Sequence, residues 1–316
     1  MKRSKKLILM TCVLAAVIVG TIAVNSLSGR EREPEPDETI NLALPRDTVA
    51  SIGWEFDAEK LRLEKGADGE WFYSTDPAFP MDQGFPQAML AALDSLTAVR
   101  EFQVSGSAAE YGLENPHIII TITAADGVET VMNIGDKNEI SGDYYLNIGS
   151  GNTVYMIGEP LALAFSQSFL DLVLPEVIKP MDTITGISII NGENVLEITT
   201  NEHDGEDEWF IAEDGGGDTG AILPLDPSEA SGLRAAVTSL RWISCVSYNP
   251  TASELAEFGM DDPSYLTVSY ITADEEEVVL TFVFGNADEF LAYVMLEGSN
   301  LVYQVDVTHV ERILTS

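Results

Sequence analysis

The residues of this chain that could do chemistry are mostly carboxylates. Its 316 residues include 52 acidic residues but only three histidines and two cysteines. Pairs of carboxylates can catalyse hydrolysis, and carboxylate-rich loops can bind calcium. The densest acidic runs, residues 204–208 and 274–277, are predicted at hairpin tips and lack the spacing of a calcium-binding loop. Because runs of this kind arise by chance in so acidic a chain, we predict no metal site and no cofactor.

The histidines and cysteines do not form a reactive set either. The three histidines, His117, His203 and His309, fall on a predicted strand start, an acidic loop and a helix, without the spacing of metal ligands. Cys245 has no histidine near it in the sequence and is interpreted as a small buried apolar residue. Cys12 lies in an apolar N-terminal segment, so it is not a disulfide partner for the folded part. The sequence also lacks the serine-hydrolase, zinc-protease and nucleotide-binding motifs. We therefore predict no catalytic residue and a non-enzymatic protein.

Net charge limits the partners of the chain. The formal charge is −36, and from residue 33 onward 10 basic residues face 51 acidic ones. Such a surface repels phosphate backbones and anionic lipid headgroups, so we predict that the protein does not bind nucleic acid. The simplest role of the acid excess is solubility, and loose binding of divalent cations is the alternative.

The N-terminus has the pattern of a membrane anchor. A basic tail, residues 1–6, precedes an uncharged apolar run, residues 7–24, which is long enough to span a bilayer. The lysines before the run predict a single-pass protein of the cell membrane with its N-terminus in the cytoplasm. Residues 25–46 then form an acidic, proline-containing linker. A cleaved signal peptide is the alternative, although the small-residue cleavage sites are poor. Either route places the bulk of the chain outside the cytoplasm.

One six-residue stretch occurs twice and organises the rest of the chain. The copies are Tyr111-Gly112-Leu113-Glu114-Asn115-Pro116 and Phe258-Gly259-Met260-Asp261-Asp262-Pro263. Each glycine suits a left-handed helix end, and each proline stops the helix before a β-rich run. Ser107 with Glu110, and Thr251 with Glu254, are spaced as capping boxes for the preceding turns. The hexamers are thus predicted to be structural corners. A ligand loop built on Glu114, Asn115, Asp261 and Asp262 is the alternative.

The repeat extends well beyond the hexamers. Trp71-Phe72 recurs as Trp209-Phe210, Ile134-Gly135 as Phe284-Gly285, and Tyr155 as Tyr303, always in the same order. We predict two repeated domains, residues 47–175 and 182–316. The matched Trp71 and Trp209 are interpreted as core anchors, and the matched Tyr155 and Tyr303 are expected to be buried in both copies. Each domain is expected to be α+β, a mainly antiparallel sheet with one or two helices, behind the N-terminal transmembrane helix. The expected helices are residues 86–96, 159–174, 227–240 and 307–314, and residues 49–64 and 70–73 are expected to form a hairpin.

These paired corners, each followed by a Gly-containing strand step and a Tyr-bearing strand, resemble the DUF4340 family of bacterial proteins of unassigned function. The resemblance covers residues 47–316, with one unit in each half. It implies a membrane-anchored extracytoplasmic protein, and members are often encoded beside ABC-type transport components. ABC-type permease components are therefore the expected partners of a non-enzymatic interaction protein. The alternatives are a ligand- or cation-binding surface module and a carboxylate-based hydrolase of envelope material. The family offers no catalytic residue to carry over.

Overall fold

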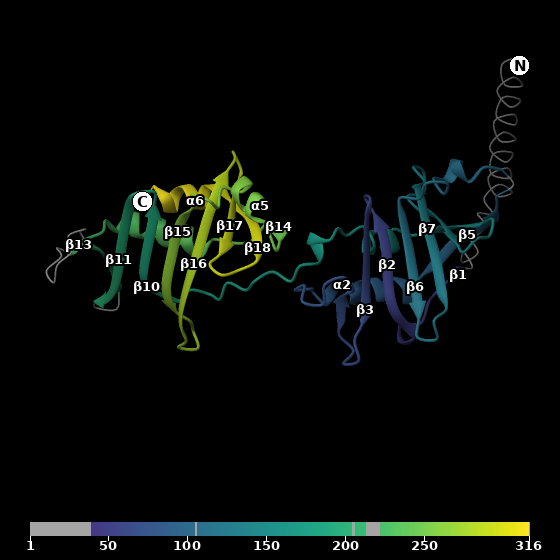
Figure 1. Ribbon diagram of the computed structural model, residues 1–316, viewed down its shortest axis with the longest axis horizontal. Coiled ribbons are helices and arrows are strands. Elements are labelled where there is room, and N and C mark those ends of the chain that lie inside the picture. Colours follow the sequence, from purple (N-terminus) through teal and green to yellow (C-terminus); the bar gives the residue numbers. More distant parts are fainter. Residues whose placement is uncertain (1–38, 105, 204–205, 213–221, 316) are drawn as a thin grey trace, which may run out of the picture. The chain divides into compact units, whose positions relative to one another are not determined.

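The computed structural model describes residues 39–104, 106–203, 206–212 and 222–315 (Figure 1). The predicted anchor at residues 7–24 and most of the linker lie outside these ranges. None of the helices within the described ranges is both long and apolar enough to span a bilayer.

The described strands form two antiparallel sheets of nine strands each (Figure 1). The first has the order β1-β5-β9-β8-β7-β6-β2-β3-β4 and the second the order β13-β12-β11-β10-β15-β16-β17-β18-β14. The strands of the first sheet are β1 (Ile40–Asn41), β2 (Val49–Phe56), β3 (Glu59–Lys65), β4 (Trp71–Tyr73), β5 (Thr97–Gln103), β6 (Ile118–Ala124), β7 (Glu129–Lys137), β8 (Tyr144–Ile148) and β9 (Thr153–Ile157). Those of the second are β10 (Thr183–Asn191), β11 (Asn194–His203), β12 (Glu206–Ala212), β13 (Ile222–Pro224), β14 (Ser244–Tyr248), β15 (Ser264–Ile271), β16 (Glu277–Ala287), β17 (Leu291–Leu296) and β18 (Leu301–Asp306).

Helices are few and short in the described residues, as the α+β prediction requires. The α-helices are α2 (Gly84–Asp94), α3 (Pro160–Ala164), α4 (Pro227–Thr238), α5 (Ala252–Glu257) and α6 (Val307–Leu314). The 3-10 helices are η1 (Arg46–Thr48), η2 (Ala108–Tyr111) and η3 (Leu170–Leu172). The predicted helices at residues 86–96, 227–240 and 307–314 are present with shifts of two residues or less at each end. Their apolar residues, such as Met89 and Leu93 of α2, are buried because they recur at helical spacing on one face.

The two sheets repeat one topology. Eight strands of the first, β5-β9-β8-β7-β6-β2-β3-β4, have the same order as β14-β18-β17-β16-β15-β10-β11-β12 of the second. Registers agree as well: Trp71 pairs with Lys65 as Trp209 pairs with Thr200. Tyr155 pairs with Leu146 as Tyr303 pairs with Val294. Because a slip of one residue would turn every side chain to the other face, this agreement confirms a true internal repeat.

The repeated tryptophans are core residues in both sheets. Trp71 is 3% exposed and Trp209 is 6% exposed, which confirms them as core anchors. The repeated tyrosines differ, because Tyr303 is fully buried whereas Tyr155 is only half-buried. The expectation that both are buried is therefore wrong. The reason is local: the Trp242 ring stacks on Tyr303 with centroids 4.3 Å apart, and the Glu176 amide donates to the Tyr303 hydroxyl at 3.0 Å.

The predicted helix over residues 159–174 is wrong. The segment contains only α3 and η3, separated by irregular backbone. Between them, Ser168 donates from both its amide and its hydroxyl to the Asp171 carboxylate, at 2.9 and 2.7 Å. The Phe169 amide donates to Glu59 at 2.8 Å. These side-chain acceptors take N–H groups that a continuous helix would pair internally, so the helix ends.

The first hairpin also differs from its prediction. Residues 49–64 form two strands, β2 and β3, joined by a tight turn at Asp57 and Ala58. Both turn residues have positive φ, 48° and 66°, as a two-residue hairpin turn with the right twist requires. The turn lacks the Asn-Gly or Asp-Gly pair that marks such turns in a sequence, so it was not predicted.

By packing, the described residues divide into two compact units. One contains the described residues up to Ala50 together with Ala88–Phe165, and the other contains Ser51–Gln87 and the chain from Ser166 onward. Aromatic rings join distant segments inside the second unit: Phe79 lies 4.5 Å from Phe169 and 5.1 Å from Tyr248 between ring centroids. The Tyr248 hydroxyl donates to Asp76 at 2.8 Å.

Candidate functional site

Both hexamers form the predicted helix-ending corner. Gly112 and Gly259 have φ of 68° and 76°, in the left-handed region that a side chain disfavours. In the first copy the Leu113 amide reaches back to the Ala108 carbonyl at 3.1 Å. In the second the Met260 amide reaches back to the Leu255 carbonyl at 2.8 Å. These bonds across one turn satisfy carbonyls that the ended helix leaves open, so the corner prediction is confirmed.

Each corner packs its backbone against a glycine in the sheet of its own copy. The Tyr111 carbonyl lies over Gly135 of β7, and the Phe258 carbonyl lies over Gly285 of β16. A Cβ on either strand glycine would come within 3.0 Å of that oxygen, a distance that real Cβ atoms essentially never show. The Asn286 amide donates to the Phe258 carbonyl at 2.7 Å. The repeated Gly135 and Gly285 steps are therefore explained by close backbone approach.

The strands are adapted to the corners in the same way in both copies. β7 loses its regular register after Ile134, and β16 loses it after Phe284, so each has a bulge next to its glycine. A bulge bends the strand locally.

The aromatic residue that opens each hexamer packs on a tyrosine of the sheet. The Tyr111 ring lies 5.0 Å from Tyr145 and 5.3 Å from Phe102, and the Phe258 ring lies 4.9 Å from Tyr293. These rings are half-buried, and their packing holds each corner against the side chains of its sheet.

The polar residues of the hexamers do not form a shared site within either unit. Glu114, Asn115, Asp261 and Asp262 are all exposed. Glu114 accepts a hydrogen bond from the Ser107 hydroxyl at 2.6 Å, which is a contact within its own turn. The first hexamer belongs to one compact unit and the second to the other. These features favour the structural interpretation of the hexamers over a ligand loop.

The two predicted capping boxes have different outcomes. In the second copy Thr251 and Glu254 form the full reciprocal box, and hydrogen bonds from the Thr251 amide and hydroxyl lower the pKa of Glu254. In the first copy the Ser107 hydroxyl oxygen accepts from the Ala109 amide and donates to Glu114, so the box with Glu110 is wrong. The reason is that η2 is a tight 3-10 turn, which brings the second amide rather than the third to the cap.

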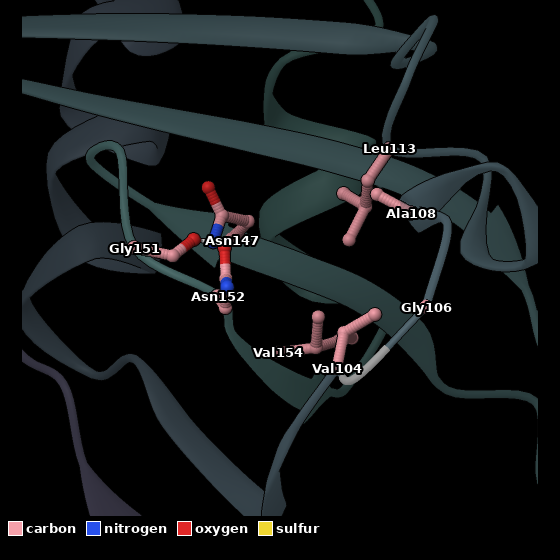
Figure 2. Close-up of a pocket in the computed structure, with 8 residues that line it drawn as sticks. All are labelled: Val104, Gly106, Ala108, Leu113, Asn147, Gly151, Asn152 and Val154. Atoms are coloured by element: carbon pink, nitrogen blue, oxygen red, sulfur yellow. Dashed lines mark hydrogen bonds between the residues drawn. The ribbon is translucent and has the colours of Figure 1, made fainter.

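A small pocket lies beside the first corner (Figure 2). Its volume is about 110 Å³. It is lined by Val104, Gly106, Ala108, Leu113, Asn147, Gly151, Asn152 and Val154. Asn147 uses its amino group internally, donating to the carbonyls of Gly151 and Thr153 at 2.7 and 2.9 Å. Metabolite sites usually measure about 300–1,000 Å³, so this space suits one side chain at most. In the second copy the larger Met260 and Met295 stand in place of Leu113 and Asn147.

The remaining reactive side chains of the described residues do not gather into one cluster. Among the described residues no three His, Cys, Asp or Glu side chains lie together as metal ligands would. His117 pairs with Asp136 at 2.9 Å on the exposed surface, His203 ends β11, and His309 lies on α6. Cys245 is half-buried, and burial raises the pKa of its thiol to about 11, so it is protonated at neutral pH. Its thiol faces the Ser247 carbonyl at 3.5 Å.

Comparison with known proteins identifies a family. A family model described as "Domain of unknown function (DUF4340)" matches the chain in two segments, residues 71–222 and 218–316. Each segment contains one hexamer. No curated protein and no solved structure matches the chain.

Proposed function

The chain belongs to the DUF4340 family, whose function is unassigned, and we propose that it is a non-enzymatic interaction protein. In this proposal the protein is held at the cell membrane by residues 7–24, and its two sheets serve as binding platforms outside the cytoplasm. The observation that carries the proposal is which positions the two copies share.

The copies agree where the backbone must pack. Gly112 matches Gly259 at the left-handed corner, and Gly135 matches Gly285 under the corner carbonyl. Positions that face solvent are not kept in the same way: Asp136 of the first copy corresponds to Asn286 of the second. The two copies therefore share the backbone shape of one sheet with one corner. A shape with variable exposed residues is what a protein-binding scaffold needs, because binding specificity resides in exposed side chains.

The charge of the chain supports a protein partner. A net charge of −36 disfavours nucleic acid and anionic lipid, and it favours partners with basic surfaces through electrostatic steering. We propose ABC-type permease components as the partners, and this part of the proposal rests on the family resemblance.

Crosslinking in native membranes tests the proposal. Tagged full-length protein is crosslinked in cells, purified from the membrane fraction and analysed by mass spectrometry. We expect permease components to be recovered, and the same tag fused to residues 1–46 alone serves as the control. Recovery of the same proteins with the control, or of no partner at all, would contradict the interaction role.

Intact-mass measurement of the membrane-extracted protein tests the anchor. We expect a mass that retains residues 7–24. A mature form beginning near residues 25–29 would show a cleaved signal peptide in its place.

A further inference from the structure

One face of the second sheet carries a row of apolar residues, two of which are exposed. Successive cross-strand pairs join Val195 to Ile190, Ile190 to Tyr265, Tyr265 to Val283, and Val283 to Met295. These five residues, here named the apolar row, lie side by side across β11, β10, β15, β16 and β17. Val195 is 48% exposed and Ile190 is 38% exposed, whereas Val283 in the middle is 9% exposed.

The row lies on the face of the sheet opposite α6, where Val195 and Ile190 are exposed and Val283 is buried. Its neighbours along the strands, such as Ile189, Leu266 and Phe282, point to the opposite face and are buried. Helix α6 covers that buried face, where it contacts β10, β17 and β18 and buries Val310 and Ile313. The apolar row therefore has no part in closing the core beneath the helices.

The first copy provides an internal control. Its matched registers place Lys60, Glu55, Ile119, Asn133 and Asn147 at the positions of the apolar row. Lys60 and Glu55 form an ion pair at 2.7 Å there. Four of the five positions are thus polar in the first copy, and the fifth, Ile119, is apolar in both. Since the fold accepts the charged pair Lys60 and Glu55 at this end of the row, the exposed Val195 and Ile190 of the second copy need another explanation.

Acidic groups border the row. The next row on the same face runs from Glu197 through Ser188, Thr267 and Thr281 to Glu297, whose amide donates to the Thr281 carbonyl at 2.9 Å. Both glutamates are exposed. None of the nine described strands of this sheet contains a lysine or arginine. The strands of this face therefore combine the apolar row with carboxylates and supply no cation, and Glu197 accepts a hydrogen bond from the Ser188 hydroxyl at 2.7 Å.

We propose that the apolar row binds an amphipathic segment of a partner protein that carries lysine or arginine beside its apolar residues. Its apolar side chains cover Ile190, Tyr265 and Met295, and its cations reach Glu197 and Glu297. Those two glutamates are four strand spacings apart, about 19 Å, which corresponds to about 13 residues of helix. This inference rests on the proposed function, because it names the surface and the chemistry of the partner.

A variant copied from the first repeat tests the row. Full-length protein in detergent micelles is titrated into a fluorescent 18-residue peptide of leucine and lysine with helical amphipathic spacing. The double variant Ile190→Glu with Val195→Lys places the Glu55 and Lys60 pair at the same position, so the fold should accept it. We expect at least tenfold weaker binding of the peptide by this variant. Ile140→Glu, at a 98% exposed site in the other copy, is the matched control and should bind like the wild type.

A second variant tests the charge without touching the row. Glu197→Gln with Glu297→Gln should weaken binding severalfold and reduce its dependence on salt. Equal affinity of the wild type and both double variants would overturn the proposal. So would equal binding of a leucine and glutamate peptide.

Photo-crosslinking in cells identifies the molecule that binds the apolar row. It also tests this surface separately from the general interaction role proposed above. Benzoylphenylalanine is placed at residue 190, and at residue 55 as the matched control. A crosslinked protein segment rich in apolar residues and Lys or Arg, obtained at residue 190 alone, supports the proposal. Crosslinks to lipid or to a second copy of this chain overturn it. Recovery of partners by the general crosslinker without a crosslink at residue 190 overturns this surface and leaves the interaction role standing.

Discussion

Replacement of Gly285 by alanine is the sharpest test of how the corner is seated. Gly285 has no positive φ, so an alanine there acts only through the space that its Cβ would occupy. That Cβ would overlap the Phe258 carbonyl oxygen and lie 3.1 Å from the carbonyl carbon. Both are backbone atoms, so no flexible side chain can move aside.

The expected cost has two parts. Forcing backbone apart in a packed region costs about 1–3 kcal/mol. Losing the hydrogen bond from the Asn286 amide to the Phe258 carbonyl costs about 1 kcal/mol more. We expect the local free energy of opening to fall by about 2–4 kcal/mol, which is roughly a 30- to 1,000-fold faster exchange of protected amides.

Hydrogen exchange followed by mass spectrometry on the full-length protein measures this locally. Amides of residues 282–287 should exchange faster in Gly285→Ala, and amides of residues 132–137 in the first copy should not. Gly135→Ala should give the mirror result, because its Cβ would meet the Tyr111 carbonyl in the same way. Gly186→Ala is the matched control, since its Cβ would meet the Ile198 carbonyl oxygen at an ordinary 3.6 Å. If Gly285→Ala exchanges like Gly186→Ala, the close approach is not real and the reasoning fails.

Three further predictions concern single groups. Gly112→Val and Gly259→Val should each destabilise their own copy by more than about 1 kcal/mol in urea unfolding, because φ is positive and a Cβ would lie 2.6 Å from the Asp136 amide or 2.7 Å from the Asn286 amide; wild-type stability in either variant would count against the corner. The hydrogen bonds of the capping box lower the pKa of Glu254 in the folded protein below its ordinary value of 4.5. The box therefore stabilises α5 fully at pH values above 4.5, and this stabilisation is lost as the pH falls through the folded-state pKa. A carboxyl titration by NMR should therefore find Glu254 below 4.5, and Thr251→Ala should move it up. Cys245, with its thiol pKa raised to about 11, should react with a disulfide reagent at pH 8 much more slowly than a free thiol in peptide does; reaction at the peptide rate would refute its protected setting.

Much of the fold follows from local sequence signals. The hexamers predicted both corners, because a glycine followed by a large apolar residue and a proline leaves the chain few alternatives. The matched Trp71 and Trp209 predicted one fold in two copies. What was missed depends mostly on contacts between segments that are distant in the sequence. The end of α3 depends on Asp171 and on Glu59 from a distant strand. The burial of Tyr303 but not Tyr155 depends on Trp242.

The apolar row shows the same limit for function. Ile190 and Tyr265 are far apart in the chain, and each belongs to an ordinary strand pattern when considered alone. Only the register of β10 with β15 brings them together. Only the matched register of the first copy, with Glu55 at the place of Ile190, shows that the fold does not need an apolar residue there. By contrast, Gly135 and Gly285 could be recognised as a repeat from the sequence. The reason that glycine is needed there, a corner carbonyl packed directly against the strand, could not.

The pairing of β10 with β15 also has a consequence for biosynthesis. Ile190 pairs with Tyr265, which is made 75 residues later. At translation rates of about 5–20 residues per second, β10 waits roughly 4–15 s for its partner, whereas its hairpin with β11 closes in about 1–10 μs. For those seconds the nascent hairpin presents a free strand edge bearing Ile187 and Ile189, which are buried in the finished sheet. The emerging second half therefore passes through a stage at which a chaperone, or the wrong strand of a neighbouring chain, meets the same edge that β15 later occupies.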